Sequence, residues 1–260
     1  MRTGLEDILG EQISGELNPD MDNGEYKRAL VIAAHPDDAD LGVGGTISKL
    51  SLNGWEIRYL IVTDGAKGTN DIKKTYDEIV NIRQKEQISS AACTGVTDVK
   101  FLGYPDGELY SSKDLRQILV KEIREFRPFT VYTHDPEPIL INNQIVNHSD
   151  HRTTGFETIN AIYPSIRDPK YFPEHFHKGI LPHKVRELIL WGTNNVNYEV
   201  DITSTIKDKL RALIAHESQF DFTSKKLSKI AKDWSKVIRN LQKHFDELLF
   251  LNRKNYEANK

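Results

Sequence analysis

The sequence predicts an α/β protein with a Rossmann-like fold: a mostly parallel sheet with helices on both faces, forming a three-layer sandwich. Short apolar segments rich in β-forming residues alternate along the chain with amphipathic segments of helical length. Such alternation is typical of βαβ units, whose crossover connections produce parallel strands. Hydrophobic residues make up 38% of the 260 residues, which is sufficient for one large core.

In the first half of the chain, each strand is predicted from a compact apolar run and each helix from apolar spacing. RALVIAAH (28–35) is a buried strand, and GGTISKLSLNGW (44–55) is a helix that ends at its second-last residue, a glycine. EIRYLIVTDG (56–65) is the second strand, and a second helix follows in IVNIRQKEQISSAACTG (79–95).

The same order continues in the second half. VKFLGYPDGEL (99–109) contains the third strand, and DLRQILVKEIREFRP (114–128) is an amphipathic helix that ends before its proline. FTVYTHDP (129–136) is the fourth strand. A helical pattern resumes in TTGFETINAIYPSI (153–166), and VRELILWGT (185–193) is the fifth strand.

The ends of the chain differ from this α/β segment in composition. Residues 1–28 show loose helical spacing followed by turn residues, and we interpret them as an N-terminal helical arm. Residues 29–223 form the main domain. Residues 224–260 are rich in lysine and arginine with apolar residues at three- and four-residue spacing, which predicts a basic amphipathic helical tail packed on the same domain.

Charge and cysteine content exclude several classes of function. The net charge of −3 argues against a nucleic-acid partner or an anionic membrane surface, and no apolar run has the length of a membrane span. Cys93 is the only cysteine, so no intrachain disulfide forms and a cytoplasmic location is expected. A metal site in this chain must therefore use histidine and carboxylate ligands.

The stretch AAHPDDADLGVGG (33–45) places polar groups directly after the first strand. Loops at the carboxyl ends of parallel strands carry functional residues, and His35 with Asp38 is half of a typical catalytic zinc site. Asp37 lies beside them and is a candidate to take a proton from water. The alternative is a turn in which an aspartate caps the following helix.

A second polar cluster, NHSDHRTTG (147–155), follows the fourth strand after a loop. It places His148 and His151 around Asp150, and the two clusters together fit one metal site assembled across the edge of the sheet. The alternative for this cluster alone is an ordinary solvated loop.

These stretches resemble the PIG-L/LmbE family of zinc-dependent N-acetylglucosaminyl de-N-acetylases, whose signature is H-P-D-D-x-E-L-G-x-G-G-T-I. The resemblance covers roughly residues 28–222 and several motifs in the same order. They are AAHPDDADLGVGGTI (33–47), TDGAKGT (63–69), IRQKE (82–86), FLGYPDGEL (101–109), HSDHRTTG (148–155), YEVDIT (198–203) and HESQF (216–220).

The resemblance implies roles for six residues. It makes His35, Asp38 and His151 the ligands of one Zn²⁺, and Asp37 the general base. His148 stabilises the oxyanion or protonates the departing amine, and Asp150 holds a histidine, His148 in our interpretation, in its working tautomer.

Three further residues are candidates for substrate binding. Asp40 stands where the family has a glutamate, so its role as scaffold or substrate contact is open. Arg83 either reaches a sugar hydroxyl or an anionic group, or pairs with Glu86 on a helix surface. Asp106 either accepts hydrogen bonds from sugar hydroxyls or only forms a turn.

His134 and Asp135 are interpreted as wall residues rather than metal ligands. His216, like His175, His177 and His183, is interpreted as a surface or packing histidine.

The resemblance therefore implies hydrolysis of the N-acetyl group of an N-acetylglucosamine-containing substrate, with release of acetate and a free amino sugar. The N-terminal arm and HRTTGF are similar to archaeal diacetylchitobiose deacetylases, which favours a chito-oligosaccharide. N-acetylglucosamine linked to malate or inositol is the second substrate, and an amidase acting on a thiol conjugate is an alternative. A homo-oligomer, trimer or hexamer, is expected from relatives. The rivals of another class are a nucleotide-binding Rossmann protein and an inactive binding module.

Overall fold

The computed structural model describes residues 27–220. The chain divides into two compact units, Met1–His216 and Glu217–Lys260, and every described helix and strand belongs to the first. The predicted tail over 224–260, and the predicted arm over 1–28 except for its last two residues, lie outside the described residues. Within residues 27–220, no helix combines the length and the apolar character that crossing a membrane requires.

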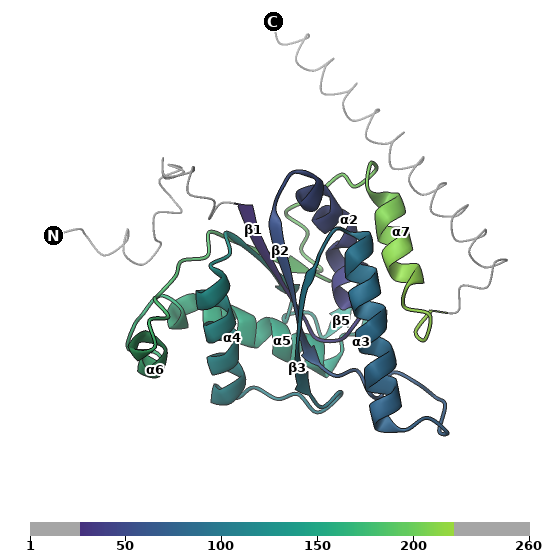
Figure 1. Ribbon diagram of the computed structural model, residues 1–260, viewed down its shortest axis with the longest axis horizontal. Coiled ribbons are helices and arrows are strands. Elements are labelled where there is room, and N and C mark those ends of the chain that lie inside the picture. The colour runs from purple at the N-terminus through teal and green to yellow at the C-terminus, as the bar shows by residue number, and fades with distance from the viewer. Residues whose placement is uncertain (1–26, 221–260) are drawn as a thin grey trace, which may run out of the picture. The chain divides into compact units, whose positions relative to one another are not determined.

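A five-stranded parallel sheet forms the centre of the fold, as the sequence predicts (Figure 1). The strand order is β3-β2-β1-β4-β7, and each neighbouring pair is parallel. The strands are β1 (Arg28–Ala33), β2 (Glu56–Thr63), β3 (Asp98–Tyr104), β4 (Thr130–His134) and β7 (Glu187–Trp191).

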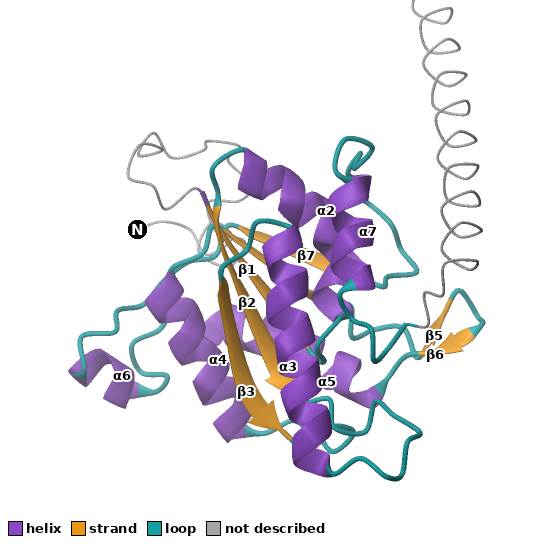
Figure 2. Ribbon diagram, turned by 45° about the vertical axis from the view of Figure 1, so that its right-hand side comes forward, coloured by secondary structure: helices purple, strands orange, loops and turns teal. Residues whose placement is uncertain are grey.

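Helices cover both faces of the sheet, which gives the predicted three layers (Figures 1 and 2). On one face α2 and α3 pack with α7, and on the other lie α4 and α5, followed by the short elements η3 and α6. The bounds are α2 (Asp38–Leu52), α3 (Tyr76–Cys93), α4 (Lys113–Phe126), α5 (Ser149–Asn160), η3 (Ala161–Ser165), α6 (Pro173–His177) and α7 (Ile206–Ile214).

The apolar run of β1 is continuous because both of its faces are buried. Leu30 and Ile32 join the core beneath α4, whereas Val31 and Ala33 join the core beneath α2. Side chains alternate along a strand, so one run of apolar residues supplies both cores.

Four features depart from the sequence expectations: the start of α2, a hairpin after β4, α6 and α7. Helix α2 begins at Asp38, six residues before the expected start, because the polar residues after β1 form its first turn. A small antiparallel hairpin, β5 (Leu140–Ile141) and β6 (Ile145–Val146), lies in the loop after β4, and the helices α6 and α7 were also not expected. The hairpin strands and α6 are too short to show a clear periodicity, whereas α7 does have an amphipathic pattern that was overlooked.

The topology brings two distant loops together at one edge. From β1 the chain proceeds outward to β2 and β3, then returns to β4 on the other side of β1, so a switch point lies between β1 and β4. Helix α5 closes this crevice by packing tightly on β4. A Cβ atom at Gly155 would lie 2.2 Å from the carbonyl oxygen of His134, so only glycine permits this approach.

Candidate active site

Three donor side chains from both predicted clusters meet at the carboxyl end of β1. His35 Nδ1 lies 3.1 Å from Asp38 Oδ2 and 3.1 Å from His151 Nε2. His151 Nε2 lies 3.2 Å from Asp38 Oδ1. A tetrahedral zinc ion with ligand bonds of about 2.0 Å separates its donors by about 3.3 Å, so these atoms lie at the spacing of one coordination shell.

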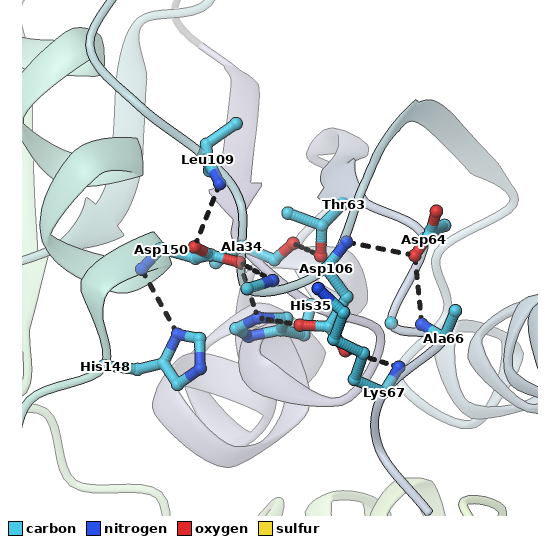
Figure 3. Close-up of polar contacts among 12 residues, drawn as sticks. Ala34, His35, Thr63, Asp64, Ala66, Lys67, Asp106, Leu109, His148 and Asp150 are labelled. Carbon is cyan, nitrogen blue, oxygen red and sulfur yellow. Dashed lines mark hydrogen bonds and ion pairs between the residues drawn. The ribbon is translucent and has the colours of Figure 1, made fainter.

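The opposite edge of the His35 ring faces two carboxylates (Figure 3). His35 Nε2 lies 3.1 Å from Asp106 Oδ1 and 3.3 Å from Asp150 Oδ2. A carboxylate on this side favours the proton on Nε2 and leaves the Nδ1 lone pair directed at Asp38 and His151. This is the usual arrangement of a metal-binding histidine, whose other nitrogen donates to a carboxylate.

The electrostatics of the cluster favour a bound cation. Burial lowers the pKa of His35, but the three surrounding carboxylates outweigh burial and raise it to about 12. Burial likewise raises the pKa of Asp38, but the facing imidazoles, His134 first, hold it well below its usual range. Both shifts reflect negative charge facing imidazole nitrogens, and two nitrogens with one carboxylate are a typical donor set for a divalent transition metal.

Among residues 27–220, other donor groups with similar spacing overlap this set. His35 and His151 also group with His148, Asp38 and His151 with His134, and His35 with Asp106 and Asp150. His134 fits poorly as a ligand because its Nε2 accepts the Ala34 N–H at 3.1 Å. Burial lowers the pKa of His134 to about 4, and its ring stacks on His151 at 4.2 Å, as a wall residue.

Asp37 is not a helix-capping residue, although it lies at the N-cap position of α2. Its side chain makes no capping hydrogen bond, and its backbone has φ of 115°, a conformation that favours glycine. Its Oδ2 accepts instead from Arg83 Nη2 at 2.9 Å. Burial and the adjacent Asp38 charge raise the pKa of Asp37 to about 7 even though Arg83 lowers it, which is the range of a general base.

His148 precedes α5 and is held in one tautomer. Its Nδ1 accepts the backbone N–H of Asp150 at 3.2 Å, so the proton is on Nε2, and its ring lies edge-on to His35 at 4.7 Å. Burial and the nearby His35 charge lower the pKa of His148, which favours the neutral ring. A neutral imidazole with Nε2–H is a hydrogen-bond donor at the site.

The interpretation of Asp150 requires a correction. We expected its carboxylate to hold His148, but only its backbone N–H does so. The carboxylate lies against His35 and accepts the N–H groups of Gly107 and Leu109 at 2.7 and 3.3 Å (Figure 3). The helix turn after His148 points the side chain of Asp150 back towards β1, so its effect falls on His35.

The three substrate candidates have other partners in the structure. Asp40 has no exposed surface, which contradicts a direct substrate contact. Arg83 is 3% exposed, so it is not on a helix surface, and its guanidinium donates to Pro36 O, Gly65 O and Asp37. Asp106 does occupy a turn, closed by Glu108 N–H to Pro105 O, but its carboxylate reaches His35 and the Lys67 N–H.

A cavity of about 380 Å³ adjoins the donor cluster. Asp38 and His151 line it, and its other lining residues come from α2, β4, β7, the hairpin and adjoining loops. They are Leu41, Gly42, His134, Asp135, Ile141, Asn147, Trp191 and Gly192. A Cβ atom at Gly42 would lie 2.8 Å from the Trp191 ring, so glycine allows this indole to form a wall. The cavity is large enough for a small organic molecule.

Sequence reasoning missed two buried residues beside the site. Gln87 Oε1 accepts the Asp37 N–H at 2.8 Å, and His216, interpreted as a surface or packing histidine, lies 3.0 Å from Asp40 and has no exposed surface. The spacing of Arg83 and Gln87, four residues apart on one helix face, is a signal that could have identified Gln87. His216 opens the HESQF motif (216–220), which is a signal that could have identified it, although the motif does not show that it contacts Asp40.

Comparison with protein families gives a match that includes the candidate site. The family model described as "PIG-L: GlcNAc-PI de-N-acetylase" matches residues 30–162. A diacetylchitobiose deacetylase of Thermococcus kodakarensis is 36% identical over 197 residues, which cover 75% of this chain and 71% of the relative. A probable N-acetyl-α-D-glucosaminyl L-malate deacetylase 2 of Bacillus cereus is 30% identical over 198 residues, 74% of this chain and 84% of the relative.

Two solved structures share this fold, and one of them is also a diacetylchitobiose deacetylase. The N,N'-diacetylchitobiose deacetylase from Pyrococcus horikoshii, in complex with its inhibitor MPG, superposes with a TM-score of 0.73 and 34% identity, covering 92% of this chain and 86% of that protein. The 4-carboxy-2-hydroxymuconate hydratase GalB from Pseudomonas putida has a TM-score of 0.61 at 21% identity and covers 73% of this chain and 78% of that protein. At that identity the hydratase shares the fold alone.

Proposed function

The chain belongs to the PIG-L family of de-N-acetylases, and on this premise we propose that it hydrolyses the N-acetyl group of an N-acetylglucosamine-containing substrate. The products are acetate and the free amino sugar. The observation that carries the proposal is the convergence of His35, Asp38 and His151 at 3.1–3.2 Å, with Asp37 adjacent in sequence to one of these donors.

The donor set fits a Zn²⁺ ion held by His35, Asp38 and His151. When bound, such an ion supplies a Lewis acid that polarises the acetyl carbonyl and makes water more acidic. Asp37 accepts the proton of the attacking water, and His148 Nε2–H donates to the carbonyl oxygen as it becomes negative. The departing nitrogen then receives the proton that Asp37 took, so each turnover consumes one water and restores both side chains.

The first candidate substrate is an N-acetylated chito-disaccharide or free N-acetylglucosamine. The two diacetylchitobiose deacetylases, at 36% and 34% identity, support it. The cavity beside Asp38 and His151 supports it too, because Trp191 offers an aromatic wall against which a sugar ring can pack. N-acetylglucosaminyl malate is the second candidate, supported by the relative that is 30% identical. We further propose a cytoplasmic homo-oligomer.

An amine-release assay across a small panel of N-acetylated sugars tests this function. The panel contains diacetylchitobiose, N-acetylglucosamine, N-acetylglucosaminyl malate and N-acetylglucosaminyl inositol. We expect zinc-loaded protein to release amine from the first two with the highest kcat/KM. If none of the four releases amine while a nucleotide raises the Tm, the chain is a binding protein instead.

Replacing His148 by alanine is expected to lower kcat by about 10²-fold, because one donor to the developing oxyanion is lost. His148→Gln retains an N–H donor and should recover part of the rate. Metal analysis accompanies the kinetics, because the metal content of His148→Ala should equal that of wild type. A matching loss of metal would place His148 among the ligands, with His35 and His151, and would overturn its proposed role.

A further inference from the structure

We propose that Gln87 and His216 are positioning residues for the general base Asp37: Gln87 holds it directly, and His216 acts on it through Asp40 and Gln87. The inference rests on the proposed function, because it takes Asp37 as the group that accepts a proton from water. It adds Gln87 and His216 to the candidate site. Their hydrogen bonds to Asp40 link the start of α2 with helix α3 and with the end of α7.

Asp37 needs external support because of its backbone. With φ at 115°, this non-glycine residue occupies a region that a free chain would leave, and a relaxed backbone would redirect the carboxylate. Helix α3 supplies two contacts that oppose this relaxation. Arg83 Nη2 donates to Asp37 Oδ2 at 2.9 Å, and Gln87 Oε1 accepts the Asp37 N–H at 2.8 Å. The two residues lie four apart, on one face of the helix.

Asp37 and Asp40 together determine which way the Gln87 amide points. Gln87 Nε2 donates to Asp40 Oδ2 at 2.9 Å. Because the backbone N–H of Asp37 can only donate, the amide oxygen must face Asp37, and the amide nitrogen then faces the carboxylate of Asp40. A flipped amide would bring oxygen against oxygen at Asp40 and N–H against N–H at Asp37. The carboxylate of Asp40 therefore helps to hold the acceptor that positions the base.

His216 completes this chain from the far end of the fold. Its Nε2 lies 3.0 Å from the same Asp40 oxygen, although the two residues are 176 positions apart in sequence. Asp40, Gln87 and His216 are all fully buried, so these hydrogen bonds are shielded from bulk water. A buried carboxylate requires such donors to keep one orientation. His216 follows the last turn of α7, which packs on α2 and α3.

The test uses the full-length, zinc-loaded protein and an N-acetylated amino sugar that the wild type hydrolyses. Three variants are compared: Gln87→Met, which keeps length but removes both hydrogen bonds; His216→Leu, which removes a donor; and His216→Gln, which retains one. The matched control is His183→Leu, another buried histidine, whose Nε2 lies 2.7 Å from Pro128 O before the start of β4. Each variant is measured for kcat, KM, metal content and Tm.

We expect Gln87→Met to lower kcat by about 30-fold and His216→Leu by about 10-fold, with KM changed less than twofold and metal content unchanged, because a displaced base affects the chemical step. His216→Gln should recover most of the rate, and His183→Leu should lower Tm without lowering kcat. In the Asp37→Asn background, Gln87→Met should change the residual kcat less than twofold, since the group it positions is already absent.

Two results would overturn the inference: a kcat within twofold of wild type for both Gln87→Met and His216→Leu, or a fall in kcat that follows loss of metal. If Gln87→Met does not fold, Gln87→Asn replaces it, because the same amide one methylene shorter cannot reach Asp37 and Asp40 together. The inference then requires the same fall in kcat from Gln87→Asn. If the wild type itself releases no amine, the proposed function is contradicted. If the wild type is active and both variants keep its kcat, only this inference is contradicted.

Discussion

Asp37→Asn is expected to lower kcat by about 10²–10⁴-fold while the protein keeps its fold and its metal, because the substitution removes a proton acceptor and little else. Asparagine has the same size and tolerates a positive φ better than most residues, so the backbone at 115° remains accessible. Asp37 is also not one of the three converging donors, so the ligand set stays complete. Steady-state kinetics with metal analysis of the same sample provide the measurement.

Asp98→Asn is a suitable control for this variant. Asp98 pairs with Arg58 at 2.7 Å where β3 begins, at the opposite end of the sheet from the site, so its loss should leave kcat unchanged. A kcat of Asp37→Asn within tenfold of the wild-type value would show that another group accepts the proton. A loss of metal in Asp37→Asn would instead make Asp37 part of the ligand set.

Metal removal is expected to abolish amine release, since the proposed reaction depends on a polarised carbonyl at this site. Dialysis against a strong chelator should remove activity and lower Tm, because an ion bound only by the folded state stabilises that state. Adding back Zn²⁺ should restore both, and parallel additions of Co²⁺, Fe²⁺ and Mn²⁺ would rank the ions by kcat. Full activity after complete metal removal would contradict the proposed chemistry.

His151→Ala should reproduce the effect of the chelator. Its imidazole contributes Nε2 to the donor triangle, so the variant should bind far less metal and should not recover when stoichiometric Zn²⁺ is added. His177→Ala is the control, because this exposed histidine belongs to α6 and to none of the donor groups. Equal metal content in His151→Ala and wild type would remove His151 from the proposed ligands.

The strands and helices could be predicted from the sequence because their signals are local. The apolar run of β1 and the helical spacing of α4 each lie within one element, and alternation between them predicted the parallel sheet. The start of α2 was missed, since polar residues needed at the site form its first turn. The β5–β6 hairpin was missed because two-residue strands have no detectable period.

The sequence predicted which residues come together at the candidate site better than it predicted their hydrogen-bond partners. His35, Asp38 and His151 lie 3.1–3.2 Å from one another, and their role as metal ligands stays a prediction. Asp150 faces His35, and Asp40 is buried with Gln87 and His216. A motif fixes which side chains are present and how far apart they are in the chain. It does not fix the direction of a side chain after a helix begins, as the first turn of α5 shows for Asp150.

The sequence by itself determined the α/β pattern, the absence of a cysteine-based metal site, and the two polar clusters that follow strands. Only the tertiary structure decided that those clusters share one crevice, that His134 serves as a wall because Ala34 N–H occupies its Nε2, and that residue 216 supports residue 40. The physical reason is distance along the chain. Apolar periodicity extends over a few neighbouring residues, whereas the crossovers of the fold bring together hydrogen-bond partners that are 100 and 176 positions apart.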